Sequence, residues 1–586
     1  METGSPSNAD RRSSLFDSAL LILTVAAMIG FLAAGCGDDD ETAGSANAPA
    51  WTGDPLTQTG SGPVRGVEGK AQTWVWKAIP FARPPVGSLR WKAPRDPEPW
   101  TAVRERSDYC APCAQYFFIG TETYGSEDCL YLNVWRPRTS ETNLPVYFWI
   151  HGGGNTLGTA SSDDYLGANL AHRSNLVVVT VNYRIGPFGW FTHPALREGA
   201  PGSELDDSGN YGTLDLIKAL EWVRDNIEAF GGDPERVMIA GESAGAFNVL
   251  SLLVSPLAEG LFQRAMAQSG GPMSSSVEEG EASAREAILK IMVNDGTAGD
   301  TAAAEAHLDD MTDPEIEAYL RGKTARQMLR AYEPWFGGMF TMPNVFPDGT
   351  VLSEGGYATL EAGTYPNKVP TILGSNKDEM KLFMFADPTF AGRDDLYEIV
   401  TSYGSDVWKA TGVDQPARKL SSHADQPDVY AYQFLWGTLD ETGGSPLPDP
   451  FGFILGAFHG LEIPFFFGND SFFVALQYLL FTEQNRPGRE ALSAAMMQYA
   501  AQFARTGNPN TPGSGLPEWQ PWSNETGGPK CILLNVDQAL ALDIEMSTTE
   551  LSVEGVLATM AEEVPEPLLS EAAAYLAPWA ENFSTD

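Results

Sequence analysis

The chain has 586 residues, of which 43% are hydrophobic, so it is long enough to bury a large core. It carries 37 Lys and Arg residues against 77 Asp and Glu residues, a formal net charge of -40 at pH 7. This charge disfavours nucleic acid and anionic membrane surfaces as partners, and it is typical of a solvated surface.

Residues 1–35 are predicted to be a signal peptide. Arg11 and Arg12 precede an apolar run over 18–34, which is short for a membrane span and ends in small residues. The run 32–36 resembles a bacterial lipobox, in which Cys36 would become the lipidated N-terminus, although Ala33 stands where that pattern prefers leucine. We therefore expect export, to the bacterial cell envelope as a lipoprotein at the periplasm or the outer surface, or otherwise as a secreted protein.

An ordinary secretory signal with an incidental cysteine is the alternative reading of this segment. The arginine pair also resembles a twin-arginine export signal, but residues 13–15 continue that pattern poorly. Residues 36–58 are acidic and rich in small residues, which predicts a disordered tether. In the lipoprotein reading, this tether would hold the protein at a membrane through the lipid on Cys36.

The body, residues 59–586, is predicted to be one α/β domain. Apolar, strand-like runs recur at 131–135, 146–150, 176–182, 237–240, 265–268, 370–373, 429–436 and 532–535. Several lack polar alternation, as buried parallel strands do, and the clearest helix lies between them at 213–230. We therefore expect a mostly parallel central sheet with helices on both faces. Residues 272–345 are helical, acidic and without strong strands, and are predicted to be a helical insertion that roofs the active site.

Ser243 is the strongest candidate for a catalytic residue. Four apolar residues at 237–240 run directly into Gly241-Glu242-Ser243-Ala244-Gly245, and a helix-compatible stretch follows. A sharp strand-turn-helix elbow needs small flanking residues and exposes the serine hydroxyl above the sheet. The Gly-x-Ser-x-Gly pattern alone is weak, but its strand and helix context favours a nucleophile.

A nucleophilic serine needs a base and a group that orients the base. Since the base follows the nucleophile and the acid in this type of fold, the candidates are His307, His423 and His459. His307 lies on an acidic helix face and His423 in a polar loop, whereas His459 lies between small and apolar residues, which favours His459. For the acid, Asp378 and Glu379 both follow the strand-like run at 370–373, and the residues alone do not separate them.

The run His151-Gly152-Gly153-Gly154 follows the strand-like run at 146–150. Glycines let backbone N–H groups turn inward and approach a ligand closely. With the N–H of Ala244, they would form an oxyanion hole for a tetrahedral intermediate.

These residues together resemble the type-B carboxylesterases, a family that includes carboxylesterases and cholinesterases on the α/β-hydrolase fold. The likeness covers about residues 60–540 and is carried by the stretches 79–87, 127–134, 182–184, 209–212, 230–234 and 503–510. By this resemblance the nucleophile, acid and base are Ser243, Glu379 and His459. The family also places the oxyanion hole at Gly153, Gly154 and Ala244.

The resemblance also bears on the cysteines. It implies a disulfide between Cys113 and Cys129, with Cys110 as the competing partner and Cys531 either unpaired or joined to Cys110. No group of cysteines and histidines has zinc spacing, so we expect neither a metal nor another cofactor.

The sequence thus predicts a serine carboxylic-ester hydrolase that forms an acyl-enzyme. The alternative is a non-catalytic, cholinesterase-like surface protein that acts in binding or adhesion. The expected partner is a small to medium, uncharged or weakly polar ester with an apolar or aromatic part, because aromatic and methionine side chains cluster near the predicted site. These side chains occur at 335–342, 383–385 and 465–467. Met380 and Asn155 stand where the family usually has glycine and an aromatic residue, so its known substrates do not transfer directly.

Overall fold

A computed structural model describes residues 50–583, apart from 106, 118–119 and 474–475. The predicted signal peptide, Cys36 and the tether up to residue 49 lie outside the described residues. Trp51 is buried, and strand β1 (Leu56–Gln58) pairs with β2 (Pro63–Arg65). Ordered structure therefore begins within the segment predicted as a tether.

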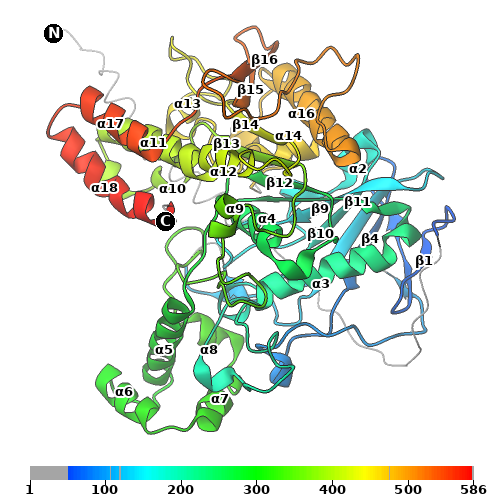
Figure 1. Cartoon of the computed structure of the whole chain (residues 1–586), viewed down its shortest axis with the longest axis vertical. Helices are drawn as coiled ribbons and strands as arrows, with labels where there is room; N and C mark the ends of the chain where they lie inside the picture. Colours follow the sequence, from blue (N-terminus) through cyan, green and yellow to red (C-terminus); the bar gives the residue numbers. More distant parts are fainter. Residues whose placement is uncertain (1–49, 106, 118–119, 474–475, 584–586) are drawn as a thin grey trace, which may run out of the picture.

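A single large sheet runs through the molecule (Figure 1). Its order from edge to edge is β16 (Leu542–Ser547), β15 (Cys531–Val536), β14 (Val429–Phe434), β13 (Thr371–Asn376), β12 (Arg264–Gln268), β11 (Gly232–Glu242), β9 (Leu144–Ile150), β10 (Val177–Val181), β8 (Tyr131–Pro137), β4 (Thr73–Pro80) and β3 (Val67–Glu68). The strands from β15 to β10 pair in parallel, and antiparallel strands flank them at both edges. This is the mostly parallel sheet that the sequence predicts.

Strand β9 shows why these apolar runs form the centre of the sheet. Its side chains alternate between two faces, and both faces are buried. Phe148 belongs to one apolar core, whereas Tyr147 and Trp149 belong to the other. A strand buried on both sides needs apolar residues at every position, which explains the missing polar alternation.

Helices cover both faces of the sheet. On one side, α3 (Tyr211–Asn226) and α4 (Ala244–Val254) contribute to the core that contains Phe148. On the other side lie α2 (Ala168–Ser174), α14 (Ile463–Phe467) and α16 (Arg486–Thr506). The helix predicted at 213–230 ends earlier than expected, because residues 227–230 tighten into a 3₁₀ turn before Gly231 adopts a left-handed conformation.

The segment predicted as an insertion is helical. It contains α5 (Val277–Asn294), α6 (Thr301–Asp309), α7 (Asp313–Arg321) and α8 (Ala325–Leu329), which lie together at one end of the molecule (Figure 1). Ser276 and Glu279 form a capping box at the start of α5. The chain then returns toward the sheet through residues 330–350.

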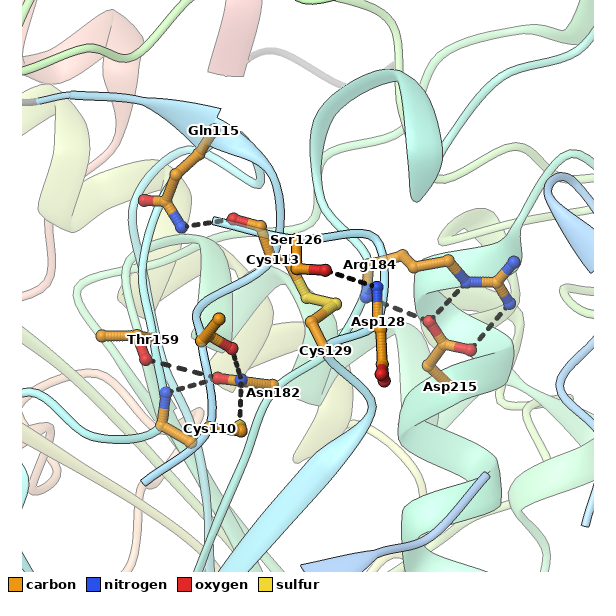
Figure 2. Close-up of a disulfide and its surroundings, with 12 residues drawn as sticks. Cys110, Cys113, Gln115, Ser126, Asp128, Cys129, Thr159, Asn182, Arg184 and Asp215 are labelled. Carbon is orange, nitrogen blue, oxygen red and sulfur yellow. Dashed lines mark hydrogen bonds and ion pairs between the residues drawn. A yellow bond between two sulfur atoms is a disulfide. The ribbon is translucent and has the colours of Figure 1, made fainter. Parts of the chain in front are cut away.

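A disulfide joins Cys113 to Cys129, with a Cα–Cα distance of 5.0 Å, which is the pairing that the resemblance implies. Cys110 Sγ accepts a hydrogen bond from Asn182 Nδ2 at 3.4 Å, and Cys531, which is buried, keeps its thiol. Figure 2 shows the disulfide together with Cys110 and Asn182, the residue that follows β10. The buried ion pair of Arg184 and Asp215 lies close to the disulfide.

Close to this disulfide, a buried ion pair fixes the chain that follows β10 (Figure 2). Arg184 donates from Nε and Nη2 to the two oxygens of Asp215, at 2.7 Å each. Both side chains are almost fully buried, so the bidentate geometry compensates their desolvation. The pair holds the loop after β10 to helix α3.

The remaining α-helices of the described residues come from the second half of the chain. They are α9 (Ala358–Ala362), α10 (Lys381–Met384), α11 (Asp394–Lys409), α12 (Gln415–Leu420), α13 (Phe451–Ile454), α15 (Gln477–Leu480), α17 (Val553–Glu563) and α18 (Leu568–Phe583). A π-helical turn, η8 (Ala410–Asp414), joins α11 to α12. Within the described ranges, no helix combines the length and apolar character needed to cross a membrane.

Candidate active site

Ser243 lies at the tip of a tight turn between β11 and α4. Its backbone has φ 57° and ψ -123°, a strained conformation for a residue with a side chain. A Cβ at Gly241 would lie 2.5 Å from the backbone of Gly245, and a Cβ at Gly245 would lie 2.1 Å from the carbonyl oxygen of Ile150. The two flanking glycines are therefore sterically required, and the turn has the geometry of a nucleophile elbow.

The glycine run after β9 passes close to this elbow. A Cβ at Gly152 would lie 2.9 Å from Ser243 Cβ. Gly153 and Gly154 have φ values of 105° and 61°, a region that glycine adopts without strain. Ala244 is the first residue of α4, where helix N–H groups have no partner in the helix. The three predicted oxyanion-hole residues are thus close to Ser243 in the fold.

Asn155 fixes the end of the glycine run. It is 2% exposed and also has a positive φ, 56°. Its Oδ1 accepts a hydrogen bond from Asn248 Nδ2 in α4 at 2.9 Å, and its Nδ2 donates to Asn344 Oδ1 at 3.1 Å. The asparagine that departs from the family pattern therefore ties the glycine run both to α4 and to the chain after α8.

His459 and Glu379 are in direct contact. His459 Nδ1 donates to Glu379 Oε2 at 2.6 Å, and Glu379 Oε1 accepts a hydrogen bond from Asn376 N at 2.6 Å. Glu379 is fully buried and follows β13, whereas His459 lies in the loop between α13 and α14. The carboxylate fixes the imidazole with its proton on Nδ1, which leaves Nε2 on the other side of the ring.

The other candidates from the sequence have different contacts. Asp378 accepts hydrogen bonds from Thr438 and Ala457 and pairs with Lys381, so it holds the loop before His459 rather than the imidazole. His423 Nε2 lies 2.9 Å from the carbonyl oxygen of Leu360, and His307 lies in α6 of the insertion.

Two further buried carboxylates, which the sequence reasoning missed, surround His459. Glu242 Oε1 lies 3.1 Å from His459 Nε2, and within the described part of the chain Nε2 makes no hydrogen bond. Glu462 accepts a hydrogen bond from Asn376 Nδ2 at 2.6 Å. The sequence marks these two carboxylates only by their positions: Glu242 directly precedes Ser243, and Glu462 follows His459 by three residues.

These carboxylates change the titration of the imidazole. Burial by itself lowers the pKa of His459, but Glu242 and Glu379 oppose it and raise this pKa to about 9. Burial raises the pKa of Glu242, an effect that His459 reduces. Burial also raises the pKa of Glu462, and the charges of Glu242 and Glu379 add to that rise. The site therefore stabilises the positively charged form of His459.

Aromatic side chains from distant segments form one wall beside His459. We call Trp335, Phe336, Phe383 and Trp408 the aromatic wall. The rings of Phe383 and Trp408 lie 5.1 and 5.0 Å from the His459 ring, and they stack on each other at 5.9 Å. Phe336 contacts Phe383 at 5.6 Å, and Trp335, which is 54% exposed, lies 5.9 Å from Phe336. The wall thus leads from the surface to the imidazole.

Met339 lies beside the glycine run, because a Cβ at Gly154 would be 3.2 Å from its sulfur. Residues 465–467, which follow the predicted base, belong to the apolar core. Phe465, Phe466 and Phe467 are buried in the core beneath α14, where they contact Phe434, Tyr432 and Trp149, respectively. Apolar clusters next to a catalytic residue can equally be core, and local sequence does not separate the two.

Among the described residues, no group of three or more His, Cys, Asp or Glu side chains has the arrangement needed to hold a metal ion. A strained serine, an imidazole oriented by a carboxylate, and inward-facing glycines are the parts needed for acyl transfer.

Comparison with known proteins gives the family. A model of the carboxylesterase family matches residues 53–394 and 392–547. The para-nitrobenzyl esterase of Bacillus subtilis is 33% identical over 479 residues, which cover 77% of this chain and 90% of that protein. The liver carboxylesterase of Sus scrofa is 32% identical over 553 residues, which cover 82% of this chain and 91% of that protein. A solved PNB esterase superposes with a TM-score of 0.64 at 30% identity, covering 84% of this chain and 98% of that one. The chain therefore belongs to the carboxylesterase family and is a carboxylic ester hydrolase with an α/β-hydrolase fold.

Proposed function

We propose that this hydrolase uses Ser243 as nucleophile, His459 as base and Glu379 as the residue that orients His459. The observation that carries the proposal is the 2.6 Å hydrogen bond from His459 Nδ1 to the buried carboxylate of Glu379, in a site that also holds the strained elbow of Ser243. Such a bond fixes the tautomer in which Nε2 accepts a proton.

The reaction proceeds through an acyl-enzyme. Ser243 Oγ attacks the ester carbonyl carbon while its proton passes to His459 Nε2. His459 then gives that proton to the leaving alcohol as the C–O bond breaks. A water molecule, deprotonated by His459, attacks the acyl-enzyme, and the proton returns to Ser243 as the carboxylic acid leaves.

The backbone N–H groups of Gly153, Gly154 and Ala244 would stabilise the negative oxygen of the tetrahedral intermediates. The left-handed conformations of Gly153 and Gly154 and the free first turn of α4 support this role. Loss of one such donor typically costs about 3 kcal/mol of transition-state stabilisation.

For the substrate, we propose a small to medium, uncharged ester with an apolar or aromatic part. The aromatic wall and Met339 support this preference, because they offer apolar contact beside His459 and Gly154. The net charge of -40 disfavours strongly anionic esters. No observation favours a non-catalytic role in adhesion.

Covalent labelling tests the nucleophile. An organophosphate should modify Ser243 and abolish hydrolysis in proportion to labelling, as peptide mapping would show. A label on another serine with full loss of activity would contradict the assignment.

A panel of esters tests the substrate. Short aryl esters should give a higher kcat/KM than choline esters, long-chain triglycerides or esters with an anionic acyl group. The highest kcat/KM for triglycerides or anionic esters would contradict the pocket proposal without affecting the triad.

We further propose that the protein is exported and anchored through a lipid on Cys36, as the sequence of residues 1–36 suggests. Mass spectrometry of the mature N-terminus tests this proposal. A mature protein that begins elsewhere, or that carries no acyl chains, would contradict it.

A further inference from the structure

The last two helices, α17 and α18, lie beyond the part of the chain that the family model matches, which ends at residue 547. We call residues 550–576 the C-terminal hairpin. Both helices pack on α11, and Figure 1 shows them at one side of the molecule beside α10 and α11. The hairpin therefore covers the segment that follows the predicted acid, Glu379.

An apolar cluster joins the hairpin to this segment. Its buried members from the hairpin are Met560, Val564, Ala572 and Leu576, and those from the segment are Met380, Met384, Phe390, Leu396, Tyr397, Val400 and Trp408. Leu576 is 2% exposed. A Cβ at Gly404 in α11 would lie 3.0 Å from both Leu576 Cδ2 and Met380 Cγ. Leu576 thus reaches α11 at the point where α11 meets the residue after Glu379.

Polar contacts hold the hairpin along its length. At its start, Leu551 N donates to Asp414 Oδ2 at 2.7 Å, which ties it to the π-helical turn after α11. In α17, Glu563 accepts a hydrogen bond from Tyr403 Oη at 2.8 Å. In α18, Tyr575 Oη donates to Asp387 Oδ2 at 2.5 Å. These anchors lie before, within and after α11, so the whole stretch 387–414 is fixed from outside.

The fixed segment carries two rings of the aromatic wall. Phe383 lies in α10 and Trp408 in the last turn of α11, and their rings lie 5.1 and 5.0 Å from the imidazole of His459. The π-helical turn also approaches the strand end beside Ser243, because a Cβ at Gly412 would lie 2.2 Å from the carbonyl oxygen of Gly270. A shift of α11 would therefore move groups that contact His459.

We propose that the C-terminal hairpin is a positioning element of the active site, which holds α10 and α11 so that Phe383 and Trp408 pack against His459. The inference rests on the proposed role of His459 as the base. The hairpin touches none of the reacting atoms and acts only through α10 and α11. Small displacements are sufficient, because misplacement of a catalytic group by 1 Å can cost about 10²-fold in rate.

The test compares two cavity-forming variants of the full chain. Leu576→Ala removes the side chain that reaches α11 at Gly404. Leu308→Ala in α6 is the matched control, because Leu308 is also 2% exposed but lies in the distant insertion. Leu576→Met is the rescue variant, since it conserves the volume of the side chain. For each protein, kcat and KM are measured with a short aryl ester, and kcat is expressed per active site as titrated with an organophosphate. Hydrogen exchange is followed in peptides from 380–409.

We expect Leu576→Ala to lower kcat per titrated site by about 10-fold, within the range that such misplacement allows, and to speed exchange in 380–409. Leu308→Ala should do neither, and Leu576→Met should restore most of kcat. An unchanged kcat per titrated site in Leu576→Ala, or an equal loss in Leu308→Ala, overturns the proposal. A wild type that hydrolyses no ester refutes the proposed function instead. In that case hydrogen exchange tests the hairpin independently of activity. The hairpin's role is overturned if exchange in peptides from 380–409 is no faster in Leu576→Ala than in Leu308→Ala.

Discussion

The elbow of Ser243 and the aromatic wall beside His459 are built in different ways. The elbow is fixed by the backbone of residues close in sequence, since a Cβ at Gly241 would lie 2.5 Å from the backbone of Gly245. The wall is assembled from the chain after α8, from α10 and from α11, and it is held by side-chain packing. The first arrangement tolerates almost no change, whereas the second can vary ring by ring. Reaction chemistry is therefore expected to depend on the elbow and on the two rings packed against His459, and substrate preference on the outer part of the wall.

The largest effect should come from Ser243→Ala. Removal of a serine nucleophile costs about 10⁶-fold in kcat in a serine hydrolase, because attack, proton transfer and acyl-enzyme formation are lost together. Turnover of a short aryl ester and circular dichroism are the measurements. The fold should be unchanged, since the side chain of Ser243 is not part of either apolar core. Residual turnover above a few per cent would refute the nucleophile assignment.

The next effect separates the two neighbouring acids. Glu379→Gln should lower kcat by about 10⁴-fold, because the amide favours the wrong tautomer of His459. Asp378→Asn is the matched control one residue away. Asp378 holds Thr438 and the backbone of Ala457, so its loss should affect thermal stability more than kcat. A crippled Asp378→Asn with a near-normal Glu379→Gln would reverse the assignment.

A third variant shifts the pH profile. His459 must be neutral to accept the proton of Ser243, so activity is lost as the pH falls through the pKa of His459. Glu242 raises that pKa, so Glu242→Gln should lower it and move the acid limb of kcat/KM to lower pH.

Glu305→Gln is the control for this shift, since it removes one exposed charge in α6, far from His459. Its profile should coincide with that of the wild type. An acid limb that stays in place or moves to higher pH in Glu242→Gln would contradict the electrostatic role of Glu242.

The same contrast explains what could be predicted from sequence. The strand before Ser243, the glycines beside it and the helix after it are adjacent in the chain, so local sterics define them. The choice between Asp378 and Glu379 needed the family, because neighbouring residues in one loop are chemically equivalent until the fold orients them. The buried contact between Glu242 and His459 joins residues more than 200 positions apart, and no local pattern reports it.

The aromatic residues show the limit most clearly. Phe383 and Phe466 both follow a predicted catalytic residue at a short distance, yet the first packs on His459 and the second on Tyr432 in the core. Whether such a ring lines a site depends on the helix that carries it and on what covers that helix. For Phe383 the covering element includes the C-terminal hairpin, a region without a recognisable motif.

The smallest effect should come from the outer end of the aromatic wall. Trp335 is 54% exposed and lies 5.9 Å from Phe336 and 6.3 Å from Phe383, so it can contact only the part of a substrate that extends toward the surface. Since an aromatic contact contributes about 0.5–1.5 kcal/mol, Trp335→Ala should raise KM for aryl esters by roughly 2- to 10-fold.

Trp335 is remote from the imidazole, so kcat should be unchanged and acetate esters of small aliphatic alcohols should be hydrolysed as before. Tyr478→Ala is the matched control, because Tyr478 is an 81% exposed ring in α15 that takes no part in the wall. Steady-state kinetics with both ester types separates the outcomes. A fall in kcat would mean that Trp335 acts on the catalytic groups rather than on binding. An unchanged KM for aryl esters would show that substrates do not reach the outer end of the wall, and the pocket would then be confined to Phe383, Trp408 and Met339.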